Sequence, residues 1–339
     1  MNTTELLKAQ HDYGKIVQGA ANANNLIPGW YYAKDNPRYA ALSADGQAEA
    51  DHLLDSISKI NTNWYDQFFR RGSFTNNELS FSGGTGKARF YSSLGYYKEQ
   101  GIIKPSDMKR ISVRNNIDFS DDKFSFSVSS NMSYVKRNYD PAYPGFISNF
   151  NSFLIPSVQV PYAKVYNTDG TFAAGGLGDI NGSKYVAAQF LDIKSKDKSY
   201  NDQLKMTTGF NLSYKLSKYV TASVATSVDF RETQTSLYES REAFIRKAEN
   251  GQTNPRTLAG AQTEVLARFI TSDIRPGLAF NKTFNDKHEI DVSAFGEYIQ
   301  ENSKAIGFKG YGIDPRTPNT SGVVVPGNSS NQLYSSVPA

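Results

Sequence analysis

Strict alternation of apolar and polar residues dominates this chain from about residue 73 to residue 300. The stretch 124–134 shows the pattern most clearly, because Ser and Asn fill the positions between its apolar side chains. The apolar register holds Phe124, Phe126, Val128, Met132 and Tyr134, with Ser130 as its one polar member. A period of two predicts a β-strand with one apolar and one polar face.

The same period predicts about eight strands, most of them near the length of about 9–11 residues that a tilted membrane-spanning strand needs. They cover 78–84, 90–98, 110–119, 124–134, 204–216, 220–230, 269–284 and 290–298. Tight turns alternate with longer connections between them. The tight turns are Thr85-Gly-Lys, Asp121-Asp, Ser217-Lys and Asn285-Asp, and the longer connections are about 100–107, 137–202 and 231–268. Membrane barrels have short periplasmic turns and long extracellular loops, so the pattern predicts an all-β, antiparallel transmembrane β-barrel segment.

The segments outside the strands predict external regions. Residues 1–72 are expected to form an extracellular loop region with short helices at about 3–10 and 45–60, and 301–339 to begin a further extracellular loop. With the tight turns on the periplasmic side, both ends of the strand run lie outside the cell. The N-terminus also has no signal-peptide pattern, which means either a cytoplasmic protein or a missing start. The strand topology favours the second, and we expect an arc of a larger barrel.

Composition narrows the class without fixing it. Tyr and Phe number 21 each, Cys is absent, and the formal net charge is +4 with no basic stripe of the kind that binds nucleic acid. No apolar run approaches the ~18 residues of a membrane helix. A barrel strand needs an apolar residue only at every second position, so the mean hydropathy of −0.52 remains compatible with a barrel.

Catalytic and metal-binding patterns are missing from the sequence. His11, His52 and His288 lie in unrelated segments without metal-ligand spacing. No nucleophile elbow, phosphate loop or dinucleotide motif occurs. We therefore expect no enzymatic activity, no cofactor and no metal.

Charged residues in the polar register of two strands are candidates for the barrel lumen. The set is Arg110, Arg114, Asp118, Glu289 and Asp291. Charged residues of a barrel lumen either line the solute path or contact a plug. The favoured interpretation is that these five residues are ordinary polar residues of a water-filled barrel wall.

Two loops combine aromatic rings with amides, the mixture that binds sugars. The candidate substrate contacts are Trp30, Tyr31, Tyr32, Asn36, Tyr139, Tyr143, Phe146 and Asn149. The same aromatic side chains could equally pack against their own loop or contact a partner protein. These two interpretations together are favoured over a direct contact with substrate.

Several motifs resemble one known family. Asn61-Thr-Asn-Trp-Tyr-Asp-Gln-Phe-Phe-Arg70 resembles the N-T-D-W-x-D-x-x-F-R segment of SusC/RagA-type TonB-dependent transporters of Bacteroidetes. The strand–turn–strand at 77–97 and the segments 99–104 and 107–114 follow in the order of that family. Val165-Tyr-Asn-Thr-Asp-Gly170 and Leu278-Ala-Phe-Asn-Lys-Thr-Phe284 are similar to later motifs.

This resemblance implies that the chain is a fragment of a 22-stranded barrel of the cell outer membrane, lacking the plug domain and the remaining strands. It implies import of oligosaccharides or peptides, with a SusD-like surface lipoprotein and the TonB complex as partners. Glycan or peptide and outer-membrane lipid would be the ligands, with no nucleic acid. Two other classes stay open: an outer-membrane adhesin or structural barrel without active transport, and a secreted β-sandwich. We expect no clean monomer in water without detergent, since the terminal strands have unpaired edges.

Overall fold

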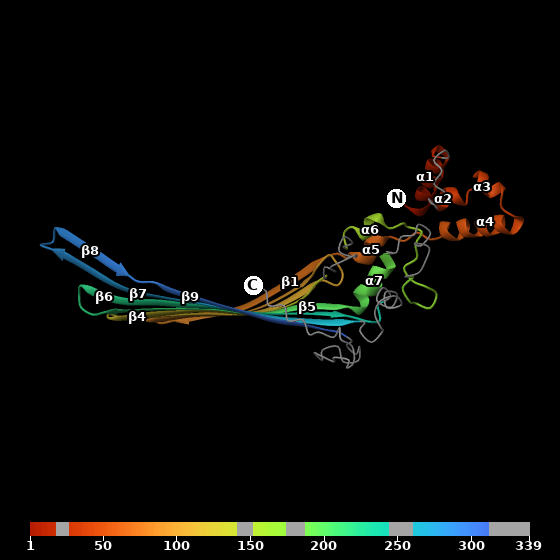
Figure 1. Cartoon of the computed structure of the whole chain (residues 1–339). Coiled ribbons are helices and arrows are strands. Elements are labelled where there is room, and N and C mark those ends of the chain that lie inside the picture. The colour runs from red at the N-terminus through yellow and green to blue at the C-terminus, as the bar shows by residue number, and fades with distance from the viewer. Residues whose placement is uncertain (18–26, 141–151, 174–186, 244–259, 312–339) are drawn as a thin grey trace, which may run out of the picture. The chain divides into compact units, whose positions relative to one another are not determined.

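The computed structural model describes residues 1–17, 27–140, 152–173, 187–243 and 260–311 (Figure 1). It divides into two compact units. One unit, built from residues 1–70, 141–197 and 240–259, holds all the helices of the described chain. The other, built from 71–140, 198–239 and 260–339, holds the β-sheet.

The helical unit contains seven helices in its described residues. They are α1 (Thr3–Ile16), α2 (Pro28–Tyr31), α3 (Pro37–Ala40), α4 (Ala44–Ser58), α5 (Trp64–Phe68), α6 (Ile155–Val158) and α7 (Ala187–Lys196). Asn2 caps α1 by accepting from the Glu5 N–H, while the Glu5 carboxylate accepts from the Asn2 N–H. This reciprocal capping box satisfies two amides that the first turn leaves free. The helix expected at 3–10 therefore continues to Ile16, and that expected at 45–60 runs from Ala44 to Ser58.

A small hydrophobic core stabilises this unit. It joins segments far apart in sequence: α5 supplies Trp64 and Phe68, α7 supplies Phe190 and Ile193, and α6 supplies Ile155. Phe68 is fully buried and its ring lies 6.2 Å from that of Phe190. The predicted external loop 137–202 therefore contributes helices whose side chains form part of a hydrophobic core.

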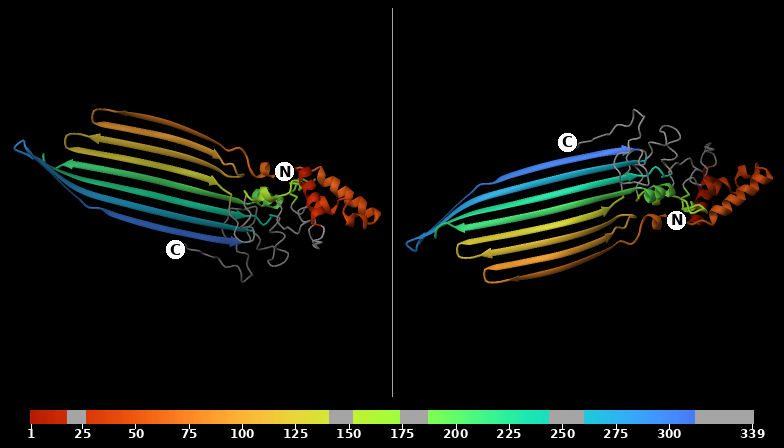
Figure 2. Two further views of the ribbon diagram at one scale, coloured as in Figure 1. Left: turned by 90° about the horizontal axis from the view of Figure 1, so that it is seen from above. Right: turned by 90° about the horizontal axis from the view of Figure 1, so that it is seen from below.

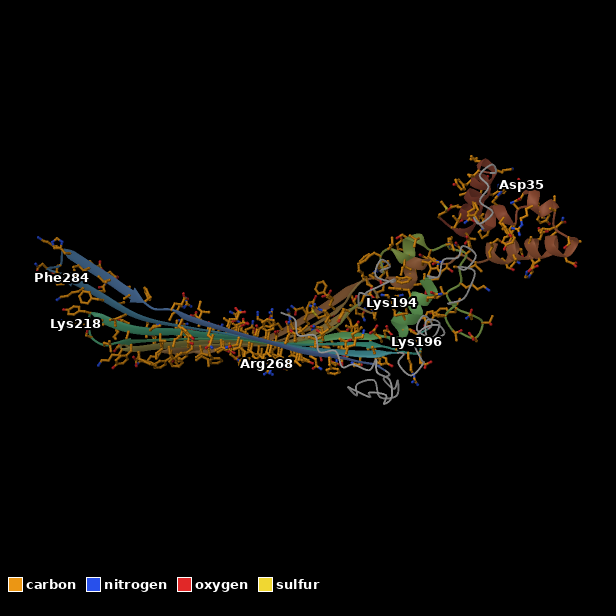
Figure 3. The ribbon with its side chains drawn as sticks, viewed as in Figure 1. Asp35, Lys194, Lys196, Lys218, Arg268 and Phe284 are labelled. Atoms are coloured by element: carbon orange, nitrogen blue, oxygen red, sulfur yellow. The ribbon has the colours of Figure 1, made fainter. Side chains whose placement is uncertain are left out.

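The sheet is antiparallel, and its strands follow one another in chain order (Figure 2). They are β1 (Ser73–Gly84), β2 (Ala88–Gln100), β3 (Asp107–Ser120), β4 (Phe124–Asn138), β5 (Lys198–Lys215), β6 (Val220–Glu239), β7 (Ala261–Phe284), β8 (His288–Phe295) and β9 (Tyr298–Tyr311). All the tight turns lie at one end of this sheet and all the longer connections at the other. Figure 3 labels Lys218 and Phe284 near the tight-turn end.

The tight turns form at the residues whose chemistry predicts them. Asp121 Oδ1 accepts from the N–H groups of Lys123 and Phe124, at 2.9 and 2.8 Å. Asn285 and Asp286 adopt positive φ values of 53° and 52°, the left-handed conformation that Asn and Asp tolerate in hairpin turns. All four predicted tight turns are present.

The eighth strand position is divided between β8 and β9. Both pair with β7 in one continuous register, with Gly277 opposite Phe295 and Ile274 opposite Tyr298. Pro276 lies between them on β7 and has no backbone N–H. At this point the Gly296 N–H donates to the Pro276 carbonyl, at 3.0 Å. The expected eight strand positions are therefore present, and the proline interrupts the last one.

The strands extend further than predicted at the end with the long connections. The connection expected at 231–268 shrinks to 240–260, that at 137–202 to 139–197, and the last strand reaches Tyr311 instead of ending near residue 300. Polar cross-strand pairs hold these extensions together, such as Arg268 Nε to Glu232 at 2.8 Å and Lys309 to Glu239 at 2.9 Å. Such pairs stabilise a sheet without apolar alternation, so the two-residue period disappears before the strand ends.

Candidate functional site

The antiparallel register places one row across six strands, and five of its six side chains are polar, Ala225 being the exception. Each residue of the row lies directly opposite the next on the neighbouring strand. In order from β2 to β7 the row consists of Arg89, Asp118, Ser127, Asn211, Ala225 and Arg275. Because residues two apart share a face of a strand, the neighbouring polar rows lie on the same face.

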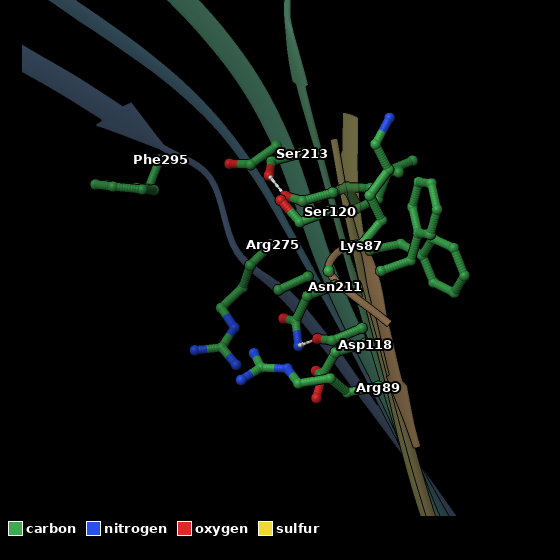
Figure 4. Close-up of a pocket in the computed structure, with 17 residues that line it drawn as sticks. Lys87, Arg89, Asp118, Ser120, Asn211, Ser213, Arg275 and Phe295 are labelled. Atoms are coloured by element: carbon green, nitrogen blue, oxygen red, sulfur yellow. Dashed lines mark hydrogen bonds between the residues drawn. The ribbon is translucent and has the colours of Figure 1, made fainter. Parts of the chain in front are cut away.

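This row lines a hollow of about 880 Å³ on the sheet, shown in Figure 4. The side chains around it carry more positive than negative charge, with Lys87, Arg89 and Arg275 against Asp118. Its remaining polar lining is hydroxyl and amide: Asn211 Nδ2 donates to Ser127 Oγ at 3.1 Å, and the hydroxyls of Ser125 and Ser213 lie 2.6 Å apart. Guanidinium groups beside hydroxyls suit carboxylates and polyhydroxylated molecules.

Arg275 is held at the edge of the hollow by two carboxylates. Its Nε lies 3.1 Å from Asp273 and 3.8 Å from Glu297, which follows the interruption opposite Pro276. These ion pairs fix where the guanidinium stands while more than half of its side chain remains exposed, at 54%. Glu297, which follows the interruption opposite Pro276, thus gives Arg275 an acidic partner beside the hollow.

All five predicted lumen residues lie on the polar face. Asp118 lines the hollow itself, whereas Arg114 and Arg110 lie two and four rows away along β3. Arg110 places its guanidinium 5.3 Å from the centre of the Tyr97 ring. Glu289 and Asp291 share one donor, the Nδ2 of Asn281, at 3.1 and 3.3 Å.

The residues that sequence reasoning missed are Arg89, Asn211 and Arg275. Each occupies the polar register of its strand, so the alternation could have placed it on this face. The pairing register between strands brings the three residues into one row. The sequence of a single strand does not specify that register.

The opposite face of the sheet is apolar and exposed. One of its rows runs across seven strands as Leu79, Leu94, Val113, Met132, Met206, Phe230 and Ile270. Leu79, Leu94 and Met132 are 69%, 51% and 45% exposed. Large apolar side chains exposed in a continuous patch mark an interaction surface.

The predicted substrate contacts in the helical unit have structural partners. Asn36 uses both ends of its amide: Nδ2 donates to the Trp30 carbonyl and Oδ1 accepts from the Arg38 N–H, each at 2.9 Å. Trp30 packs edge-on against His11, with ring centres 5.7 Å apart. Both side chains therefore contribute to the packing of the helical unit.

Tyr31 and Tyr32 are half-buried and lie in contact with each other. Their rings meet edge to face at 5.0 Å, and Arg38 covers one face of Tyr31 at 3.6 Å. Burial, followed by the charge of Glu49, raises the pKa of Tyr32.

In the sheet unit, Tyr139 anchors the end of β4, since its N–H donates to the Ser199 carbonyl at 3.3 Å. Tyr143, Phe146 and Asn149 lie outside the described residues.

Charges in the helical unit form one cluster around Asp35. His11 Nε2 lies 2.8 Å and Lys15 Nζ 2.7 Å from its carboxylate, whose position Figure 3 labels. The hydrogen bond with Lys15, followed by that with His11, lowers the pKa of Asp35 to about 2. The bond to Asp35 and then that to Asp12 raise the pKa of His11. The cluster joins α1 to the segment that follows α2.

Neither a metal site nor a membrane-spanning helix occurs in the described part of the chain. Its His, Asp and Glu residues form no group of three that could hold a metal ion. None of its helices is long and apolar enough to cross a bilayer.

An antiparallel sheet of long strands with one polar and one apolar exposed face is the kind of structure that forms a barrel wall. Solved structures of the RagAB peptide transporter have this fold. One matches 99% of this chain with a TM-score of 0.66 at 17% identity, and one of the closed-closed state matches 100% of it with a TM-score of 0.62. The fold class, an all-β antiparallel barrel segment, is confirmed.

Sequence relatives agree with the structural match. The chain is 25% identical over 270 residues to TonB-dependent receptor P39 of Formosa agariphila, covering 79% of this chain and 24% of that protein. It is 28% identical over 142 residues to receptor P3 of the same organism, covering 40% of this chain and 14% of that protein. It is 30% identical over 116 residues to the TonB-dependent receptor SusC of Bacteroides thetaiotaomicron, covering 32% of this chain and 12% of that protein. No protein-family model matches.

In sequence and in fold, the chain is similar to SusC/RagA-type TonB-dependent receptors. It spans between 12% and 24% of the length of these curated relatives, and 36% of the RagAB chain. The relatives are receptors and transporters rather than enzymes, in agreement with the sequence-based expectation of no enzymatic activity.

Proposed function

We propose that this chain forms part of the wall of an outer-membrane transporter that imports oligosaccharides or peptides with energy from TonB and with a surface lipoprotein partner. SusC and the peptide transporter RagAB, to which the chain is similar, support this proposal. In this arrangement residues 1–72 and the long connections lie outside the cell, and the strands from residue 73 cross the membrane.

The separation of the two faces is the observation that carries the proposal. Apolar rows with Leu94 at 51% and Val292 at 57% exposure would be costly in water, at about 25 cal/mol per Å² of apolar surface. Lipid removes that cost. On the other face, the row from Arg89 to Arg275 needs water or a polar solute. A bilayer outside and an aqueous lumen inside satisfy both faces together.

Adjacent residues of β4 offer a matched test of this assignment. Met132 lies in the apolar row and Asn131 in the polar row that contains Arg114. In the complete receptor, Met132→Lys should destabilise the inserted barrel by about 2–4 kcal/mol near the bilayer centre, and Asn131→Lys by far less. The yield of folded receptor in outer-membrane fractions, read from heat-modifiable migration on gels, measures both. Equal losses would contradict the proposed membrane.

Transport itself is tested by uptake. Deleting the receptor should abolish growth on one class of oligosaccharide or peptide as the sole nutrient, and inactivating TonB should do the same while leaving surface binding intact. If the solute binds to the cell surface but neither deleting the receptor nor inactivating TonB lowers its uptake, the result would instead support an adhesin or structural barrel.

The solute contacts remain proposals. Of the predicted set, we assign solute contact to the half-buried rings of Tyr31 and Tyr32, while the Asn36 amide bonds within the helical unit and Trp30 contacts His11. The Arg89–Arg275 row would face solute, or a plug, on the lumen side. Tyr31→Ala and Tyr32→Ala should weaken uptake at limiting solute, while Asn36→Ala should lower receptor yield; the reverse result would contradict this division.

A further inference from the structure

Three lysines stand side by side on the apolar face of the sheet. Lys98 on β2 lies directly opposite Lys109 on β3, which lies directly opposite Lys136 on β4. All three side chains are exposed. Neighbouring strands are about 4.8 Å apart, so three positive charges lie within roughly 10 Å.

This arrangement is unfavourable, because like charges directly opposite each other destabilise a sheet. The one acidic residue of the same row, Asp202 opposite Lys136, offsets at most one of the three positive charges. The acidic groups nearest on this face have other contacts. Asp202, opposite Lys136, accepts from the Tyr134 hydroxyl at 3.0 Å, and Asp107 accepts from Asn138 Nδ2 at 2.9 Å. Among the described residues no ion pair involves the three lysines, and Lys136 has only the Tyr200 ring at 5.3 Å.

The lysine row lies at the boundary of the apolar surface. One row closer to the tight turns come Tyr96, Ile111 and Tyr134, and the next row holds Leu94, Val113 and Met132. Tyr96 and Tyr134 are 41% and 45% exposed. Tyrosines followed by lysines are the side chains that occupy the interface between hydrocarbon and headgroups, with the lysine stem on the apolar side and the ammonium in the polar layer.

We propose that Lys98, Lys109 and Lys136 bind the phosphate of lipid headgroups in the leaflet at the end of the sheet with the long connections. The inference rests on the proposed function, since it requires the apolar face to contact a bilayer. Continuity of the row with the exposed apolar surface favours a membrane lipid over an acidic protein, which would leave the apolar rows uncovered. The phosphates neutralise the lysine repulsion and fix the depth of this arc in the membrane.

Lipid retention by the purified complete receptor tests the proposal. The probe is phosphatidylglycerol mixed with phosphatidylcholine in detergent micelles, and native mass spectrometry counts the lipids kept by the folded receptor. The triple variant Lys98→Gln, Lys109→Gln, Lys136→Gln should lose its preference for phosphatidylglycerol by roughly five-fold per lysine, or about a hundredfold in all. The matched control, Arg137→Gln with Lys205→Gln and Arg231→Gln, removes three charges from the polar face and should keep the preference.

An unchanged preference in the lysine variant, or an equal loss in the control, would overturn the proposal. Displacement of phosphatidylglycerol by millimolar inorganic phosphate would overturn it too, because it would indicate a site for free anions. An added acidic protein that displaces the lipid from the lysine row would also overturn it. The Met132→Lys and Asn131→Lys pair separates this failure from failure of the proposed function. A receptor that inserts with the expected asymmetry but retains no phosphatidylglycerol overturns the lipid site alone.

Discussion

The indole Nε1 of Trp64 donates a hydrogen bond to the backbone carbonyl of Val160 at 2.9 Å, across 96 positions of sequence. Trp64 belongs to the segment 61–70 whose motif resembles the SusC/RagA family. Thr62 reinforces the contact, with its N–H donating to the Pro161 carbonyl and its hydroxyl to the Ala163 carbonyl, both at 2.7 Å. The motif therefore has a structural role, since it fastens the helical segment before β1 to the long connection after β4.

Replacing Trp64 with Phe should loosen this connection. The ring is kept in part, but the Val160 carbonyl keeps only the Ala163 N–H as a donor, at 3.2 Å, and the loss of one hydrogen bond costs about 0.5–1.5 kcal/mol. Hydrogen exchange of the amides of Val160, Tyr162 and Ala163 in the complete receptor should speed up accordingly. Tyr65→Phe, at a neighbouring side chain that is 52% exposed, is the control and should leave the exchange unchanged. Equal protection in both variants would show that the hydrogen bond is dispensable.

Gly14 permits the close packing of α1 on α2. A Cβ at this position would lie 2.1 Å from Cγ of Trp30, far inside van der Waals contact. Gly14→Ala should therefore destabilise the α1–α2 contact by about 1–3 kcal/mol through overpacking, outweighing the gain in helix propensity of about 1 kcal/mol. Faster hydrogen exchange in α1 measures it. Gly86→Ala meets no atom within 4 Å and should have no such effect; a stabilised Gly14→Ala variant would refute the packing argument.

The His11–Asp35–Lys15 cluster should make the local stability of α1 depend on pH. The His11 pKa is raised above 6.5, so its contribution is complete below pH 6.5 and is lost as pH rises through the raised value. The Asp35 pKa is lowered from 3.8 to about 2, so its contribution is complete above pH 3.8 and is lost as pH falls toward 2. Protection of α1 amides should be greatest between about pH 4 and 6.5.

The variant His11→Gln should remove the decline in protection on the alkaline side of that window and keep the decline on the acid side. His52→Gln, which removes a histidine on α4 outside the cluster, serves as the control and should preserve both. Exchange rates corrected for intrinsic pH dependence give the readout. A profile for His11→Gln that still declines above pH 6.5 would show that another group is responsible.

Alternation along single strands was enough to predict the antiparallel sheet and the tight turns, since both arise from neighbours in sequence. The stretch 124–134 and the turn at Asp121 needed no tertiary information. The ends of β6 and β7 were missed because the ion pair of Glu232 with Arg268 replaces apolar alternation there. A short polar extension of this kind has the same local pattern as a loop.

The sequence by itself determined which face of each strand is polar, because a period of two leaves each side chain only one of two faces. It also placed Arg110, Arg114, Asp118, Glu289 and Asp291 on the polar face. Tertiary structure alone decided which of these side chains meet. Register joins Arg89 to Asp118, and through four further strands to Arg275, and a shift of one residue between any two strands would break that row. The Trp64–Val160 contact and the core around Phe68 likewise depend on chain segments about a hundred residues apart, which no local pattern specifies.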